Sequence, residues 1–101
     1  MPALRELGWR VLYHDVRIAQ VQVDILARTP RGLLCLVEVK ARSELSHLSL
    51  AQERRLRRIG GILAQFEPVE IWLASVSRDH KVALIPVDGL TENEDMGHLR
   101  G

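Results

Sequence analysis

The sequence is poor in cysteine and has no long apolar run. Cys35 is the only cysteine in 101 residues, so neither an intramolecular disulfide nor a thiolate zinc cluster can form. Apolar runs stay far below the roughly 20 residues that cross a bilayer, and residues 1–8 lack the apolar core of a secretory signal. We therefore expect no membrane association and a cytoplasmic location.

A strong excess of one charge is also missing. Fourteen Lys and Arg residues face 13 Asp and Glu residues, for a formal net charge of +1. Because local fields come from clusters, one basic group matters more than this total; it comprises Arg54, Arg55, Arg57 and Arg58. The length suits one modest core. We expect a single domain over residues 1–90 and a disordered polar tail over 91–101.

Two periodic segments predict a β-hairpin in the first half of the chain. In residues 20–28 apolar and polar positions alternate, which is typical of a strand with one buried face. Residues 33–40 are almost continuously apolar and include Cys35, which predicts a strand buried on both faces. The turn sequence Thr29-Pro30-Arg31-Gly32 joins them.

The remaining elements complete an α/β pattern. We expect a short helix ending near Gly8, a strand over residues 9–17, a helix from Ser49 to Pro68, and strands over 69–75 and 81–87. Ser49 and Gln52 fit a capping box, and Gly60-Gly61 weakens the helix but allows close packing on a sheet. The order α-β-β-β-α-β-β predicts a central mixed sheet of about five strands flanked by helices. Apolar positions assigned to the core include Leu56, Ile59, Leu63, Phe66, Trp9, Tyr13 and Trp72.

The hairpin carries a set of charged residues that suits phosphodiester hydrolysis. Glu38 and Lys40 share one face of their strand, because residues two apart point the same way. If the hairpin register sets Asp24 opposite Glu38, two carboxylates and an ammonium converge. Carboxylates are ligands that Mg²⁺ prefers, and the carbonyl of Val39 is a further candidate ligand. Lys40 could position or deprotonate water. The alternative is a structural ion pair at a strand end.

Four segments resemble the YraN family of predicted endonucleases. They are LGWRVL (7–12), DVR (15–17), VQVDILA (21–27) and LVEVKAR (36–42), and the similarity covers roughly residues 4–66. That family belongs to the PD-(D/E)XK superfamily and is related in fold to archaeal Holliday junction resolvases. The resemblance implies a restriction-endonuclease-like fold, metal-ligand roles for Asp24 and Glu38, and a catalytic role for Lys40.

The chain departs from the family pattern at three polar positions. Gln22, which we expect on the face of Asp24, stands where the family usually has a glutamate, so metal binding should be weak. A glutamate of a longer N-terminal helix has no counterpart here. Gln52 stands where the family has a lysine, and it either completes the helix cap, which we favour, or orients water or a phosphate.

These residues lead to one principal hypothesis and two alternatives. The principal one is a Mg²⁺- or Mn²⁺-dependent DNA endonuclease, with structured or branched DNA as the substrate implied by the family. The alternatives are a degenerate nuclease acting as a non-catalytic nucleic-acid-binding or assembly module, and a domain whose missing acids come from a partner. A homodimer is a further expectation. Arg42 is a candidate phosphate contact, whereas Arg54, Arg57 and Arg58 are either phosphate contacts or a solvated helix face.

Overall fold

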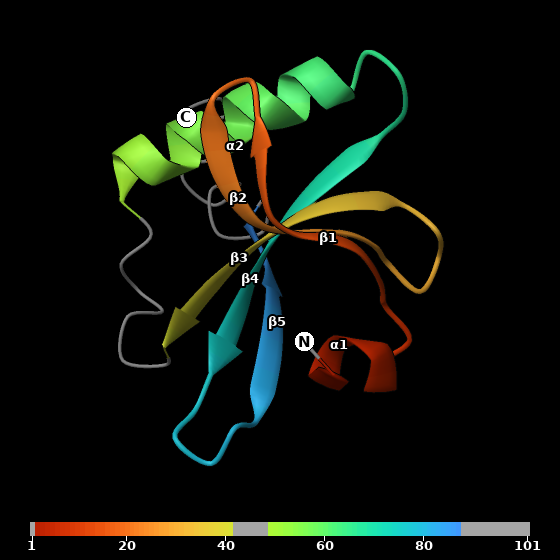
Figure 1. Cartoon of the computed structure of the whole chain (residues 1–101), viewed down its shortest axis with the longest axis vertical. Helices are drawn as coiled ribbons and strands as arrows, with labels where there is room; N and C mark the ends of the chain where they lie inside the picture. Colours follow the sequence, from red (N-terminus) through yellow and green to blue (C-terminus); the bar gives the residue numbers. More distant parts are fainter. Residues whose placement is uncertain (1, 42–48, 88–101) are drawn as a thin grey trace, which may run out of the picture.

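The computed structural model describes residues 2–41 and 49–87, and its elements follow the predicted order (Figure 1). They are α1 (Pro2–Glu6), β1 (Arg10–Ile18), β2 (Val21–Arg28), β3 (Leu34–Ala41), α2 (Leu50–Leu63), β4 (Val69–Val76) and β5 (Val82–Pro86). Neither helix of this described part has the length and apolar character needed to cross a bilayer. The predicted tail over 91–101 lies outside the described residues.

The strands form one five-stranded sheet in the order β1-β2-β3-β4-β5. Strands β3 and β4 are parallel, and every other neighbouring pair is antiparallel. Parallel neighbours need a long crossover connection, which here contains α2. The predicted α/β architecture with a mixed sheet is therefore confirmed.

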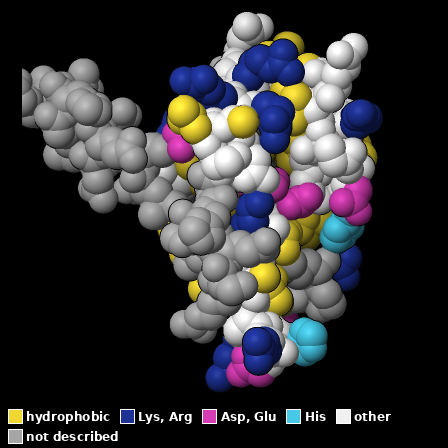
Figure 2. Space-filling view, turned by 90° about the vertical axis from the view of Figure 1, so that its left-hand side faces the viewer, with side chains coloured by type: hydrophobic (Ala, Val, Ile, Leu, Met, Phe, Trp, Pro, Cys, Tyr) yellow, Lys and Arg dark blue, Asp and Glu magenta, His cyan; other side chains and the backbone are white. Residues whose placement is uncertain are grey.

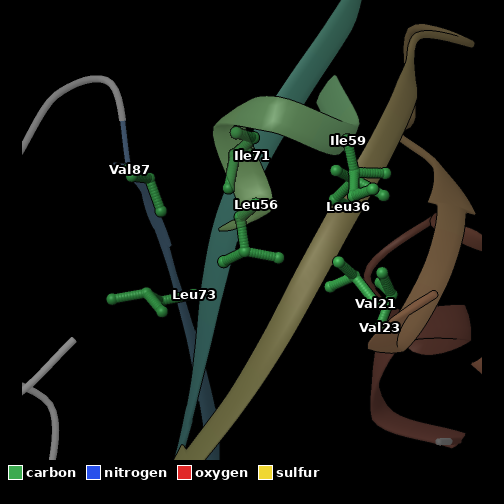
Figure 3. Close-up of a cluster of buried hydrophobic side chains, with 8 residues drawn as sticks. All are labelled: Val21, Val23, Leu36, Leu56, Ile59, Ile71, Leu73 and Val87. Atoms are coloured by element: carbon green, nitrogen blue, oxygen red, sulfur yellow. The ribbon is translucent and has the colours of Figure 1, made fainter. Parts of the chain in front are cut away.

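The buried side chains form two clusters, one on each side of β3. On the α2 side, Leu56 and Ile59 pack against Leu36 and Ile71 (Figure 3). On the other side, Cys35 and Val37 pack with residues from α1, β2, β4 and the residue before β1, namely Leu4, Ile25, Ala27, Ala74 and Trp9. Strand β3 is thus buried on both faces, as its continuous apolar sequence predicts.

Strand β2 belongs to two environments along its length. Ile25 and Ala27 pack on the α1 side of the sheet, whereas Val21 and Val23 join the cluster beneath α2. The antiparallel pairing between β2 and β3 ends at the Ile25–Val37 pair. The first half of β2 continues with β1 as a hairpin whose turn lies near α2 (Figure 1). Asp24 therefore stands where β2 leaves β3.

Two of the predicted core aromatics are wrongly assigned. Phe66 is 81% exposed and Tyr13 is 60% exposed. Helix α2 ends at Leu63, before Pro68 is reached, so Phe66 lies in the following turn instead of on the apolar helix face. In β1 the register shifts between Val11 and Tyr13, which breaks the simple alternation of faces.

The other aromatic and glycine predictions hold. Trp9 is buried, and its ring meets that of Trp72 edge to face with centroids 5.2 Å apart. Gly60 is buried, and a Cβ atom placed on it would lie 3.5 Å from Cδ1 of Ile71. Gly61 is exposed, with no atom within 4 Å of such a Cβ. Only Gly60 therefore packs closely on the sheet.

Gly61→Ala should stabilise the protein. Alanine lowers the backbone entropy cost of the helix and meets no steric obstacle, so the free energy of unfolding should rise by about 0.5–1 kcal/mol. Urea unfolding followed by circular dichroism measures this change. Gly32→Ala is the matched control: Gly32 has φ +85°, and a side chain there should destabilise by about 1 kcal/mol. A destabilised Gly61→Ala variant would contradict the helix packing described here.

Candidate active site at the end of β3

Asp24 is fixed to β3 by a hydrogen bond that replaces a strand-ladder contact. Its Oδ2 atom accepts a hydrogen bond from the backbone N–H of Val39 over 2.8 Å. This bond lies just beyond the Ile25–Val37 pair. The carboxylate thus satisfies a backbone donor that β2 no longer reaches, and the Asp24 side chain is held at the edge of β3.

The carbonyl of Val39 points to the same edge as Asp24. In a β-strand the N–H and C=O groups of one residue face the same neighbour. Because the N–H of Val39 faces Asp24, its carbonyl oxygen lies on this side too. The orientation suits the predicted role of this oxygen as a metal ligand.

Glu38 is half-buried and interacts directly with Asp24. Burial raises the pKa of Glu38 to about 7; the negative charge of Asp24 and a hydrogen bond between the two side chains add to this rise. The positive charge of Lys40, and more weakly that of Arg55, opposes it. The structure therefore brings Asp24, Glu38 and Lys40 together.

This donor set fits a divalent cation. Two carboxyl groups and a backbone carbonyl supply hard oxygen ligands, and a cation placed among them would favour the ionised form of Glu38, which burial and the charge of Asp24 disfavour. In residues 2–41 and 49–87, no group of three or more Asp, Glu, His and Cys side chains comes together.

A small cavity of ≈ 40 Å³ adjoins Glu38. Polar side chains from three elements line it: Gln22 of β2, Gln52 and Arg55 of α2, and Glu38 itself. Gln52 also completes the capping box, because its Oε1 accepts from the N–H of Ser49 and its N–H donates to Oγ of Ser49, each over 3.1 Å. The predicted cap is confirmed, and the same residue borders the site.

The predicted basic residues fall into different places. Arg54, Arg57 and Arg58 are exposed on α2; Arg57 pairs with Glu53 over 3.0 Å, and Arg58 donates to the carbonyl of Ala19 over 3.5 Å. Figure 2 views the side on which α2 begins, where Lys and Arg side chains gather around a smaller group of Asp and Glu side chains. Arg42 lies outside the described residues.

Arg55 is the site residue that sequence reasoning missed. It stands three positions after Gln52, and residues three apart on a helix are neighbours. Since Gln52 is itself a candidate site residue, this spacing would indicate Arg55 near the site once packing fixes the rotation of α2. From the sequence, Arg55 is only a member of the basic cluster Arg54, Arg55, Arg57 and Arg58, with no role at the site.

A second, larger cavity lies on the other side of the sheet and contains none of the predicted site residues. It measures ≈ 520 Å³ and is bordered mainly by apolar side chains, among them Trp9, Trp72 and Leu84. Its polar side chains include Arg31 and Glu70, whose Oε1 accepts a hydrogen bond from the Trp72 indole over 3.0 Å. The residues that border this cavity include no acid pair comparable to Asp24 and Glu38.

Solved structures similar to this one establish the fold class as restriction-endonuclease-like. A repair endonuclease from Pyrococcus abyssi superposes with a TM-score of 0.59 at 20% identity, covering 93% of this chain and 38% of that one. The structure of an EndoMS–dsDNA complex gives a TM-score of 0.58 at 23% identity, covering 93% and 36%. This chain thus spans well under half the length of either protein.

The chain belongs to the uncharacterised protein family UPF0102, the YraN-like family, whose model matches residues 1–80. The family resemblance seen in the sequence is therefore confirmed. Among curated proteins, none matches the chain.

Glu38→Gln should change how stability depends on pH. Because the folded state raises the pKa of Glu38 from 4.5 to about 7, the wild type loses stability as pH rises through this range, whereas the variant has no such titration. The stability of Glu38→Gln relative to wild type should therefore increase between about pH 4.5 and 7.

Chemical unfolding at several pH values measures this difference. Asp24→Asn serves as the comparison, because removing the neighbouring charge should shrink the pH-dependent loss that Glu38 causes. A Glu38→Gln difference that stays constant across the range would refute the acid pair.

Proposed function

We propose that this protein is a metal-dependent DNA endonuclease that hydrolyses phosphodiester bonds. The observation that carries the proposal is the contact between Asp24 and Glu38 beside Lys40, at the point where β2 leaves β3. Two adjacent half-buried acids, one of them with a raised pKa, are typical of functional sites. The likeness to the two endonuclease structures supports this reading through the fold.

Asp24, Glu38 and the carbonyl of Val39 would hold the Mg²⁺ or Mn²⁺ ion. Such an ion supplies Lewis-acid polarisation of a phosphate ester and lowers the pKa of water. Asp24 is oriented for this role by its bond to Val39. The neutral Gln22, in place of a carboxylate, should make the ion weakly bound.

Lys40 would act on the reacting water and phosphate. It follows Glu38 by two positions on β3, and its charge is close enough to lower the pKa of Glu38. From that position an ammonium group can orient a water molecule or stabilise negative charge that develops on the phosphate oxygens.

DNA would lie over the α2 side of this site. Exposed Arg54, Arg57 and Arg58 on α2, with Arg42 after β3, offer contacts to the phosphate backbone that carry no sequence information. One similar structure is a complex with double-stranded DNA, which supports DNA as the partner. Structured or branched DNA stays our proposed substrate class, from the family resemblance.

A non-catalytic DNA-binding module is the second candidate. It is favoured by the neutral amides of Gln22 and Gln52 at the cavity beside Glu38, where the family usually carries ionised groups. This candidate predicts DNA binding without cleavage in any divalent ion. The homodimer also stays a prediction, and light scattering that finds only a monomer at every workable concentration would remove it.

Asp24→Asn should remove Mn²⁺ binding. Calorimetric titration of the wild type should give one weak site, and the variant should give none, because the amide loses the charge that holds the ion. Gln22→Glu is the converse variant and should tighten binding by adding a carboxylate near Glu38. Equal Mn²⁺ affinity in wild type and Asp24→Asn would reject Asp24 as a ligand.

Lys40→Ala should abolish cleavage and leave DNA affinity nearly intact. Loss of a proton-transfer or charge-stabilising group typically costs on the order of 10²–10⁴ in rate. The assay uses labelled single-stranded, duplex, flap and four-way DNA, with and without Mn²⁺. Lys81→Ala is the matched control, because Lys81 is the only other lysine and is exposed in the β4–β5 hairpin. Full cleavage by Lys40→Ala would exclude the proposed role.

A further inference from the structure

Arg55 occupies a distinct position among the arginines of α2. It borders the cavity beside Glu38 together with Gln22 and Gln52. Arg54 and Arg55 are both exposed, but Arg54 does not border this cavity. Arg55 therefore belongs to the acid site, whereas its neighbour belongs to the outer helix surface.

The fold fixes the direction in which Arg55 points. The capping box between Ser49 and Gln52 sets the start of α2, and buried Leu56 anchors the next residue in the core. These two constraints leave α2 little freedom to rotate about its axis. Arg55 is thus placed on the side of α2 that borders the cavity.

Two positively charged side chains from different elements therefore lie near Glu38. Lys40 comes from β3, and Arg55 comes from the first half of α2, near the positive end of the helix dipole. The carboxyl group of Glu38 lies on the same face of β3 as Lys40 and borders the same cavity as Arg55. A phosphate group entering this site would meet positive charge from the strand and from the helix.

The cavity side of Glu38 is poorly suited to a second metal ion. Two-metal sites need acidic ligands for both ions, but Gln22 and Gln52 supply only neutral amides here. A second divalent ion would also face the positive charge of Arg55.

We propose that Arg55 binds a non-bridging oxygen of the DNA phosphate and takes the place of a second metal ion, so that the site uses one divalent cation and one arginine. The inference rests on the proposed nuclease function and specifies how its substrate is held. A guanidinium has paired N–H donors that can hydrogen-bond to two phosphate oxygens at once, whereas an ammonium lacks this bidentate geometry. Arginine is therefore required, and lysine is a poor substitute.

Arg55→Gln and Arg55→Lys test this role, with Arg54→Gln as the matched control. The first readout is Mn²⁺ titration of the DNA-free protein. Wild type should bind one ion, and Arg55→Gln should bind Mn²⁺ several-fold more tightly because a repelling charge is lost. Arg54→Gln should match wild type. A second Mn²⁺ site in the wild type would overturn the inference.

The second readout is binding of thymidine 5′-monophosphate in Ca²⁺, which reports phosphate recognition without cleavage. Arg55→Gln should weaken binding at least tenfold, Arg55→Lys should recover little of it, and Arg54→Gln should have no effect. Equal loss in Arg54→Gln and Arg55→Gln would overturn the inference, since the arginines would then act only as general positive charge.

The third readout is DNA cleavage, and it separates the two proposals. Arg55→Gln should lower kcat by on the order of 10²–10³ with a smaller change in KM, because the outer arginines still hold DNA. If wild type cleaves nothing but Arg55→Gln loses monophosphate binding, the nuclease proposal fails and Arg55 is confirmed as a phosphate-binding residue. If wild type cleaves and Arg55→Gln cleaves equally well, the nuclease proposal stands and the role of Arg55 is refuted.

Discussion

One hydrogen bond, from the N–H of Val39 to the carboxylate of Asp24, determines how the candidate site is assembled. It forms where β2 leaves β3, so a side chain replaces the strand that would otherwise pair there. The bond holds Asp24 against Glu38 and turns the Val39 carbonyl to the same edge. If β2 instead stayed paired with β3 to its start, backbone atoms would fill the space that the carboxyl groups use.

The same arrangement places a cost on folding. Glu38 is held near Asp24 in a half-buried position. This position disfavours the ionised form of Glu38, and its pKa is therefore raised to about 7. Lys40 and Arg55 reduce this cost but do not remove it, because the pKa remains raised. A site that holds two carboxyl groups together in a half-buried position is less stable than apolar residues packed there, and this difference is typical of functional sites.

Much of this arrangement could be predicted from the sequence because its signals are local. Alternation in β2, the apolar run of β3 and the capping box at Ser49 each specify an element without knowledge of distant contacts. The Asp24–Glu38 contact follows once the turn fixes the hairpin register. Exposure of Tyr13 and Phe66 could not be predicted, because it depends on a register shift in β1 and on where α2 ends. The place of Arg55 depends on how α2 rotates against the sheet, which only packing decides.

The most direct test of the central claim is anomalous diffraction from crystals soaked in Mn²⁺, which locates the ion independently of any assay. A single peak about 2.1 Å from carboxylate oxygens of Asp24 and Glu38, with the Val39 carbonyl in the same coordination sphere, is the predicted result. A peak bound elsewhere, or none at saturating Mn²⁺ while Asp24 and Glu38 remain in contact, would contradict the assignment of this acid pair as the metal site.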